Sequence, residues 1–298
     1  METISPLISV QDLLKLQSEK VEVKLFDVTN GVNAKKEYEN QHLNNAVLVD
    51  INFQLAKIEE DVSFGGRHPL PKIEDFSKIL GLLGINQKTH VVLYDRNNGA
   101  NAASRFWWML KAIGHEKVQI LDGGFQAAEK LGYPINNEKV AIQEAENYPV
   151  EKWNLPLITI DEVDANKANN DFLIIDVREE KRYNGISEPI DLIAGHIPNA
   201  VNIPFSENLD ENGFFLNQKL LQEKYSTLFE KYSSKNIVVH CGSGVTACHT
   251  IFAIHYAGFV TLSTDRKSAD EVLEVPNLYV GSWSEWSRRE GKEIAKGV

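Results

Sequence analysis

The chain has 298 residues, of which 43% are hydrophobic and 24% charged, a composition typical of a folded globular protein with one or two domains. Its formal net charge of −11 argues against partners such as nucleic acid and anionic membranes, which require a basic surface. No basic region followed by a long apolar core opens the sequence, and no stretch approaches the length of a membrane span. Two cysteines are too few for a disulfide framework or a zinc site, so we expect a protein of the reducing cytoplasm.

In chain order, six segments of the first half recur in the second half. The first pair is LISVQDL at 7–13 and LITIDEV at 157–163, in which Ser9 and Thr159 predict helix N-caps. The other pairs are KLFDV with LIIDV, HLNNAVLVD with HIPNAVNIP, VVLYD with IVVHC, KAIGH with HYAGF, and ILDGGF with YVGSW. Six matches in one order indicate two copies of one domain.

Each copy alternates short apolar runs with helical runs. VKLFDV, HVVLYD, LIIDV and NIVVHC are rich in β-branched and apolar residues and predict buried parallel strands. The segments after VVLYD and IVVHC predict helices that end at Gly114 and Gly258. We therefore expect an α/β fold in which each copy has a central parallel sheet flanked by helices, with the chemistry at the carboxyl ends of the strands. The polar stretch 144–156, which holds two prolines, is the expected linker between domains at 1–143 and 157–298.

The strongest chemical signal follows the strand that ends at His240. Cys241 is followed by a short loop with Gly242 and Gly244 and then by a helix. The glycines allow backbone N–H groups to turn inward as an anion-binding nest, and the helix N-terminus adds partial positive charge. Such a cradle stabilises a thiolate or the outer sulfur of a persulfide, and Ser243 and Thr246 add hydroxyl donors.

This loop, HCGSGVTA, resembles the active-site loop of the two-domain sulfurtransferases, the rhodanese and 3-mercaptopyruvate sulfurtransferase group. The resemblance covers most of the chain in the family's order, in GGRHPLP, YDRNNGANAASRFWWML, ILDGGF, DVREEKRYNG, GHIPNAVNIPF and GSWSEW. It implies two tandem rhodanese-like domains, of which only the second is catalytic. In the first, Asp95 stands at the position that matches Cys241 and cannot carry sulfur.

The resemblance also assigns roles to residues outside the loop. Arg182 matches the family arginine that faces the sulfur donor, and we expect it to clamp the donor's carboxylate. His68 matches a histidine proposed to form a relay with the loop serine, here Ser243; a purely polar role at the domain interface is the alternative. The acidic member expected for this relay falls at Asn52, with Asp50 nearby.

The donor is predicted from the residues around the cysteine. Family members that prefer thiosulfate usually carry basic residues directly after the cysteine, whereas the mercaptopyruvate group carries Gly-Ser-Gly, as this chain does at 242–244. A second arginine, common in that group before GHIP, is absent here, where Ile190 and Asp191 stand. Arg96 and Arg105 of the first copy are the candidates to replace it.

Other reactive side chains have structural interpretations. We expect Arg178 to form an internal ion pair and His196 a structural hydrogen bond. Cys248, two helical turns after the active-site cysteine, is interpreted as a packed core thiol, with a resolving thiol as the alternative. The histidines have no spacing that indicates a metal site.

The sequence thus predicts a sulfurtransferase that moves sulfur from 3-mercaptopyruvate, through a persulfide on Cys241, to a thiol such as thioredoxin or to another thiophile. The predicted site consists of catalytic Cys241, Ser243 and His68 and of donor-binding Arg182, Gly242, Gly244, Val245 and Thr246. No metal or organic cofactor is implied, and a monomer is expected because two fused copies supply the interface of a dimer.

Three alternatives stay open at this point. Thiosulfate as the donor keeps the reaction class. A phosphatase of the same fold would need an arginine after five intervening residues, where this chain has Ala247. A non-enzymatic binding module would not need the intact cysteine and its glycines.

Overall fold

The computed structural model describes residues 4–262 and 274–297, which form two compact units. Unit 1 consists of Met1–Ala56, Pro71–Asn154 and Glu211–Phe215, and unit 2 of Lys57–Leu70, Leu155–Asp210 and Leu216–Val298. Each half of the sequence therefore contributes a segment to the unit built mainly from the other half. The segment 57–70, which carries His68, belongs to unit 2.

Unit 1 is built on a five-stranded parallel sheet. Its strands, in spatial order, are β1 (Leu7–Ile8), β6 (Val118–Leu121), β5 (Val91–Tyr94), β2 (Lys24–Asp27) and β4 (Ala46–Leu48). A separate antiparallel pair joins β3 (His42–Leu43) to β7 (Ile135–Asn136). The central strands β5 and β6 are buried along their whole length, as expected for a sheet that is covered on both faces.

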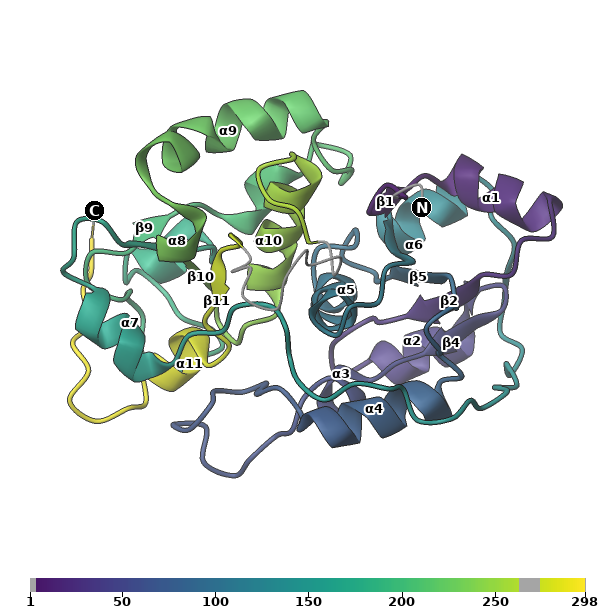
Figure 1. Ribbon diagram of the computed structural model, residues 1–298, viewed down its shortest axis with the longest axis horizontal. Helices are drawn as coiled ribbons and strands as arrows, with labels where there is room; N and C mark the ends of the chain where they lie inside the picture. The colour runs from purple at the N-terminus through teal and green to yellow at the C-terminus, as the bar shows by residue number, and fades with distance from the viewer. Residues whose placement is uncertain (1–3, 263–273, 298) are drawn as a thin grey trace. The chain divides into compact units, whose positions relative to one another are not determined.

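Helices cover both faces of this sheet. On one face, α1 (Val10–Ser18) and α6 (Gly124–Lys130) pack their apolar side chains on the strands. On the other face lie α4 (Ile73–Leu82) and α5 (Ala102–Ala112), where Phe106 makes edge contacts with Phe26 and Phe76. The short helices α2 (Ala34–Asn40) and α3 (Ile51–Gln54) flank β4 in the chain (Figure 1).

Unit 2 repeats the strand order of unit 1. Its parallel sheet runs β11 (Asn277–Leu278), β10 (Ile237–His240), β8 (Leu173–Asp176) and β9 (Val201–Asn202). Leu157 forms a parallel bridge to Leu278, in the place that β1 has beside β6 in unit 1. The predicted pair of parallel-sheet α/β domains is therefore confirmed, with the first edge strand of the second copy reduced to one bridge.

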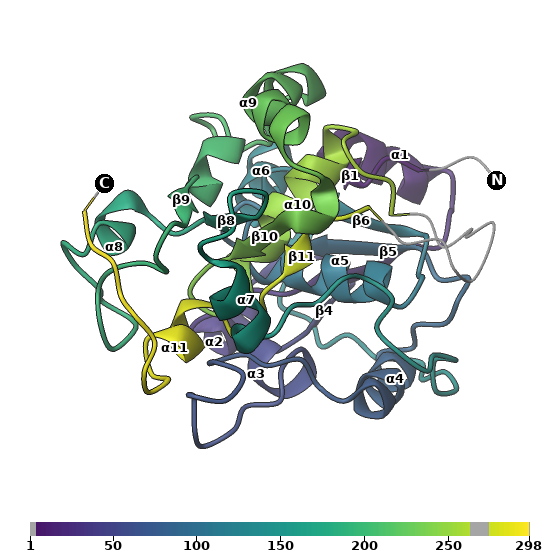
Figure 2. The same cartoon turned by 60° about the vertical axis from the view of Figure 1, so that its left-hand side comes forward.

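The helices of unit 2 lie on two sides of its sheet. In Figure 1, α9 (Gln218–Lys231) and α10 (Thr246–Tyr256) lie above β10 and β11, and α7 (Ile160–Asn166) and α11 (Ser282–Trp286) lie below them. The turned view in Figure 2 also places α10 next to β10. The remaining short helices are α8 (Glu180–Tyr183), η1 (Phe205–Asn208) and η2 (Ser234–Asn236).

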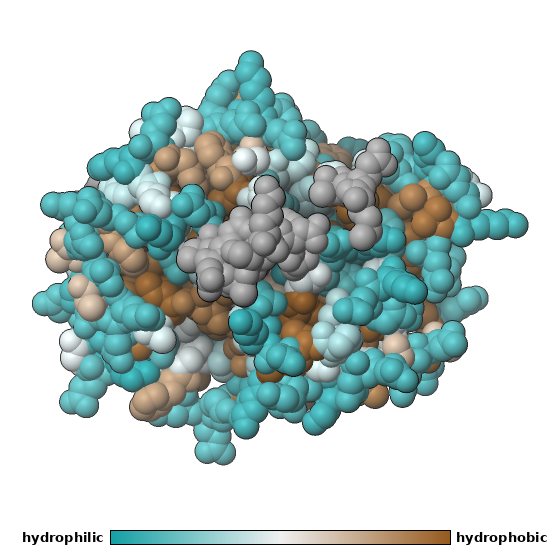
Figure 3. All heavy atoms as spheres, in the orientation of Figure 1, coloured by the Kyte–Doolittle hydropathy of each residue, from teal (hydrophilic) through white to brown (hydrophobic). Residues whose placement is uncertain are grey.

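The local signals of the repeat are confirmed in the backbone. Ser9 and Thr159 are both N-caps, and each side chain accepts the N–H of the residue three positions on; Thr159 completes a capping box with Glu162. Gly114 and Gly258 have φ of +83° and +89° directly after α5 and α10, as helix-ending glycines require. None of the described helices is long and apolar enough to cross a membrane. The face drawn in Figure 3 is mostly hydrophilic, in keeping with the high charge content.

A buried ion pair holds the sheet of unit 2 to the loop after β8. The Arg178 guanidinium donates to Asp176 at 2.6 Å and to Glu188 at 3.2 Å, and it stacks on the Trp283 ring at 4.5 Å. All of these groups are buried. Burial acts to raise the pKa of Asp176, but the charge of Arg178 and its hydrogen bonds hold that pKa below the usual value. The predicted internal ion pair of Arg178 is confirmed.

We predict that Arg178→Met destabilises the protein by about 3 kcal/mol or more, because the buried Asp176 loses its main cation and Glu188 loses one of its two. Urea unfolding followed by tryptophan fluorescence measures the change. Lys219→Met, which removes an exposed lysine of the same unit, is the control and should change stability by less than about 0.5 kcal/mol. Equal effects of the two substitutions would contradict the role given to the buried pair.

Candidate active site

The candidate nucleophile lies at the carboxyl end of the central strand of unit 2. Cys241 follows β10 directly, is 2% exposed, and starts a four-residue turn into α10 at Thr246. The N–H of Cys241 donates to Ser282 Oγ at 3.2 Å, and its carbonyl accepts the N–H of Trp283 at 2.9 Å. The loop is therefore bonded at the cysteine itself to the first turn of α11.

Gly244 makes the tight return of this loop possible. It has φ of +71°, and a Cβ at this position would lie 2.5 Å from the carbonyl oxygen of Val280. From below, the buried Cys248 thiol donates to the Gly244 carbonyl at 3.3 Å. Cys248 is thus packed in the interior against the loop, as the interpretation as a core thiol predicted. Val245 occupies the N-cap position of α10.

The segment 57–70 brings His68 to this loop. Its backbone is fixed to α11, since the Arg67 N–H donates to Ser284 Oγ and the Gly65 N–H to Glu285 Oε1, both at 3.0 Å. In this position His68 Nδ1 lies 2.9 Å from Ser243 Oγ. Both side chains are buried. The two residues that the sequence predicted as partners, 175 positions apart, are thus in hydrogen-bond contact.

A second group of charges lies next to Gly242. A Cβ on Gly242 would lie 2.9 Å from Arg67 Nη2 and 3.3 Å from Arg182 Nη2. Both guanidinium groups bond the buried carboxylate of Asp191, Arg67 at 3.0 and 3.3 Å and Arg182 at 3.2 Å. Burial acts to lower the pKa of Arg182, but its bonds to Glu188 and the nearby carboxylates raise it above the usual value. Arg182 therefore stays charged beside the loop, where the sequence placed it.

Arg67 was missed by sequence analysis. Its only signal was a basic residue directly before His68 in GGRHPLP. The ion pair with Asp191 joins residues 124 positions apart, and no local sequence pattern predicts such a pairing. The alternatives named for a second arginine are engaged inside unit 1: Arg96 donates to the carbonyls of Glu37 and Gln41, and Arg105 is wholly buried in α5.

The residues at the place expected for the acidic member of the relay form a local hydrogen bond. Asp50 is the N-cap of α3 and accepts the N–H of Asn52 at 2.8 Å. Both residues belong to unit 1, whereas His68 and Ser243 belong to unit 2. Within unit 2, His68 and Ser243 are in hydrogen-bond contact.

The histidines next to the site are structural. Burial lowers the pKa of His240, and the nearby Asp176 only partly opposes this, so the ring before Cys241 is neutral and supplies no cation to the thiol. His196 Nδ1 bonds the carbonyl of Tyr183 at 2.9 Å and its ring stacks on Tyr183, which confirms its expected structural bond. In the part of the chain that the structure describes, no cluster of three or more His, Cys, Asp or Glu could hold a metal ion.

Unit 1 contains a twin of the loop in which a carboxylate takes the place of sulfur. Asp95 follows β5 as Cys241 follows β10, and its carboxylate is fully buried. It accepts four backbone N–H groups, from Asn97 at 2.8 Å, Gly99 at 2.9 Å, and Asn101 and Ala103 at 3.1 Å. Burial raises its pKa and the four donors oppose the rise. In this fold the loop after the central strand thus solvates a buried anion with backbone N–H groups.

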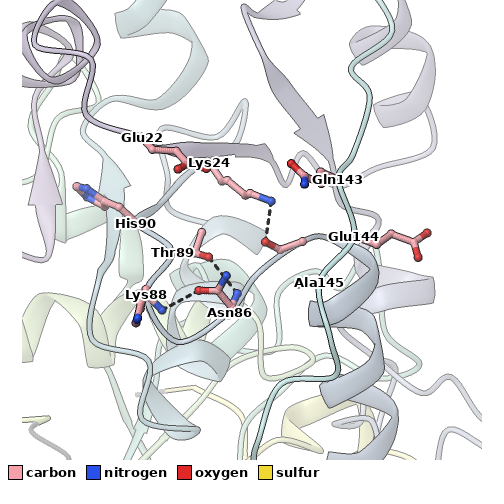
Figure 4. A pocket seen from close by; sticks show the side chains of 10 residues that line it. Glu22, Lys24, Asn86, Lys88, Thr89, His90, Gln143, Glu144 and Ala145 are labelled. Carbon is pink, nitrogen blue, oxygen red and sulfur yellow. Dashed lines mark hydrogen bonds between the residues drawn. The ribbon is translucent and has the colours of Figure 1, made fainter.

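A hollow elsewhere in unit 1 has different chemistry. It has a volume of about 450 Å³ and is lined by Glu22, Lys24, Gly84, Asn86, Lys88, Thr89, His90, Gln143, Glu144 and Ala145 (Figure 4). Lys24 donates to the Gly84 carbonyl at 2.6 Å, across this hollow. Its lining offers no thiol, so it does not compete with the loop at Cys241 as a site for sulfur.

Known proteins resemble the chain over nearly its whole length. The family model of the rhodanese-like domain matches it twice, at residues 9–130 and 159–289. A probable 3-mercaptopyruvate sulfurtransferase from Pseudomonas aeruginosa is 35% identical over 87% of this chain and 86% of its own length. A thiosulfate sulfurtransferase from Gallus gallus is 34% identical over 86% and 82%. The structure of a 3-mercaptopyruvate sulfurtransferase from Leishmania major superposes with a TM-score of 0.78 and 25% identity, covering 96% of this chain and 76% of that one.

We predict that Asp95→Asn lowers the stability of unit 1 by about 2–4 kcal/mol, because the amide NH2 of asparagine must face backbone N–H donors. Urea unfolding measures the loss, and Asp171→Asn, at an exposed position, is the matched control. Sulfur loading at Cys241 should persist in the folded fraction of the variant. An unchanged stability would show that the carboxylate is dispensable to the loop.

Proposed function

The chain belongs to the family of rhodanese-like domains and contains two of them, and we propose that this sulfurtransferase takes sulfur from 3-mercaptopyruvate on Cys241 and passes it on from the resulting persulfide. The observation that carries the proposal is the loop between β10 and α10. There the buried Cys241 is followed by Gly242, which lies next to Arg182, and by Ser243, which is bonded to His68; the twin loop of unit 1 cradles a carboxylate.

The reaction is a displacement at the donor's sulfur. The thiolate of Cys241 attacks that sulfur, an S–S bond forms, and the C–S bond of the donor breaks with its electron pair going to carbon. That pair is delocalised into the adjacent carbonyl as an enolate, and the proton of the donor's thiol ends on the carbon. Cys-S⁻ and HS-CH2-CO-COO⁻ thus give Cys-S-S⁻ and CH3-CO-COO⁻; the cysteine sulfur is oxidised and the carbon reduced. Backbone N–H groups of the loop stabilise the negative outer sulfur.

Ser243 and His68 are suited to the proton transfer. Ser243 Oγ is bonded to His68 Nδ1 at 2.9 Å and follows the nucleophile by two residues. A hydroxyl coupled to an imidazole can polarise the donor's carbonyl and deliver a proton to the departing carbon. Arg182 orients the donor through its carboxylate, and such orientation supplies a large part of the rate in reactions of this kind.

The choice between donors depends on the loop, because overall similarity does not decide it. Relatives named for mercaptopyruvate and for thiosulfate are 35% and 34% identical to the chain. The neutral residues 242–244 after the cysteine favour the monoanionic keto acid over the dianion thiosulfate, which gains more from cations within the loop itself. Thiosulfate stays the alternative donor.

The acceptor in the second half of the cycle is proposed to be a thiol such as thioredoxin in a reducing cytoplasm. The thiolate of the acceptor attacks the outer sulfur of the persulfide and releases the Cys241 thiolate. Four apolar side chains around the buried Asp191 are more than a third exposed, which suits the approach of a protein carrying that thiol; they are Ile186, Ile190, Leu192 and Ile193.

We predict that incubation with 3-mercaptopyruvate adds one sulfur atom to the protein and releases pyruvate. Intact-mass spectrometry detects the added sulfur, which a thiol acceptor should then remove. Cys241→Ser abolishes the addition, whereas Cys248→Ser retains it if the second cysteine only packs under the loop. No added sulfur from either mercaptopyruvate or thiosulfate would rule out the proposed function.

A second prediction concerns the relay. Ser243→Ala should lower kcat with 3-mercaptopyruvate by about 10²–10⁴-fold, because the departing carbon must be protonated. With thiosulfate the fall should be much smaller, since sulfite leaves as a stable anion and needs no proton. The measurement is kcat for pyruvate release and for sulfite release, with the exposed Ser18→Ala as control. Equal losses with both donors would remove the relay from the mechanism.

A further inference from the structure

We propose that Arg67 is a donor-binding residue, which forms with Arg182 a two-guanidinium seat for the donor's carboxylate beside Gly242. The inference rests on the proposed function and deepens it. It assigns to the segment 57–70 the second cation that the stretch before GHIP does not supply. Where that arginine was expected, Ile190 is exposed and Asp191 is buried.

The geometry places both cations at one point of the catalytic loop. The Nη2 atoms of Arg67 and Arg182 would lie within 3.3 Å of a Cβ on Gly242, the residue next to the nucleophile. The absence of a side chain there leaves room for these tips. Because Arg67 also precedes His68, one segment brings a cation to Gly242 and the histidine to Ser243.

Asp191 keeps the two guanidinium groups side by side. Its carboxylate, which is fully buried, accepts Arg67 Nε at 3.0 Å, Arg182 Nη2 at 3.2 Å and Arg288 Nη1 at 3.0 Å. Arg182 is also paired with Glu188 and, at 3.6 Å, with the exposed Glu179, whereas among the described residues Arg67 and Arg288 share Asp191 as their carboxylate partner. Their positive charge is therefore only partly compensated at this point. A second carboxylate, that of the donor, is the ligand chemistry that would balance it.

Arg67 is available to a ligand as well as to Asp191. Its side chain is 26% exposed, whereas that of Asp191 is fully buried, so the guanidinium reaches from the ion pair toward solvent. Asp191 takes up only Nε and Nη2. Among the described residues no partner for Arg67 Nη1 occurs, which leaves that N–H pair for a carboxylate in the fork geometry that guanidinium favours.

The test compares two donors in Arg67→Met. One is 3-mercaptopyruvate; the other is an alkyl hydropersulfide without a carboxylate, whose outer sulfur, in the protonated form, is attacked by the Cys241 thiolate with release of the alkyl thiolate. We expect kcat/KM for 3-mercaptopyruvate to fall about 10- to 100-fold, mainly through KM, as for a lost charge-assisted hydrogen-bond pair. Loading by the hydropersulfide should change less than about 3-fold. Arg67→Lys should recover part of the loss, and the exposed Lys219→Met controls for overall charge.

Any other outcome contradicts the proposed two-guanidinium seat. Equal losses with both donors would show that Arg67 only supports Asp191 and the loop, and an unchanged KM for 3-mercaptopyruvate would show that it does not touch the donor. If the unaltered protein takes no sulfur from 3-mercaptopyruvate, the proposed function and the seat both fail. If it takes sulfur and Arg67→Met keeps its KM, only the seat fails.

Discussion

The first turn of α11 holds the site together. The N–H groups that open a helix have no partners within it, and in many proteins they face an anion or a capping side chain. Here the N–H groups of Trp283 and Ser284 donate to the carbonyls of Cys241 and Gly242, and Ser284 Oγ accepts the N–H of Arg67. One helical turn therefore fixes the loop that begins at Cys241 and the segment that carries His68. Ser282 starts this turn with φ of +54°, a strained conformation that its two bonds, from Cys241 N–H and to the Tyr279 carbonyl, offset.

The two copies of the domain show how one loop serves two purposes. The strand order is the same, and in both the central strand ends in a group that can be negative, Asp95 or Cys241. Four backbone N–H groups stabilise the buried carboxylate of Asp95, so these donors are not available to a ligand. In the proposed mechanism, a thiolate in the corresponding place attacks the donor and is extended by one sulfur. We propose that the first copy takes no part in this step because a fixed carboxylate occupies its cradle.

Local patterns predicted most of the fold. The strands β2, β5, β8 and β10 and the helices α5 and α10 lie where runs of apolar residues and helix-ending glycines placed them. The contact of His68 with Ser243 was also expected, but through a resemblance and not through periodicity. What the sequence did not disclose is the assignment of 57–70 to unit 2 and the bond of Arg67 to Asp191. Both depend on long-range pairing, and a lone arginine or aspartate carries no signal of which distant partner it will meet.

The charges around the loop explain how a protein of net charge −11 can bind an anion. Surface charges farther away than about 10 Å are largely screened at physiological salt, so the local balance decides. Four guanidinium groups, those of Arg67, Arg178, Arg182 and Arg288, meet three buried carboxylates, those of Asp176, Glu188 and Asp191, and the exposed carboxylate of Glu179. Arg178 and Asp176 neutralise each other in the interior, and solvent screens the exposed Glu179, so the local charge at Gly242 is set mainly by the converging tips of Arg67 and Arg182 and by Asp191. Asp191, although negative itself, holds together guanidinium groups that would otherwise repel one another. A buried carboxylate thereby concentrates positive groups beside Gly242.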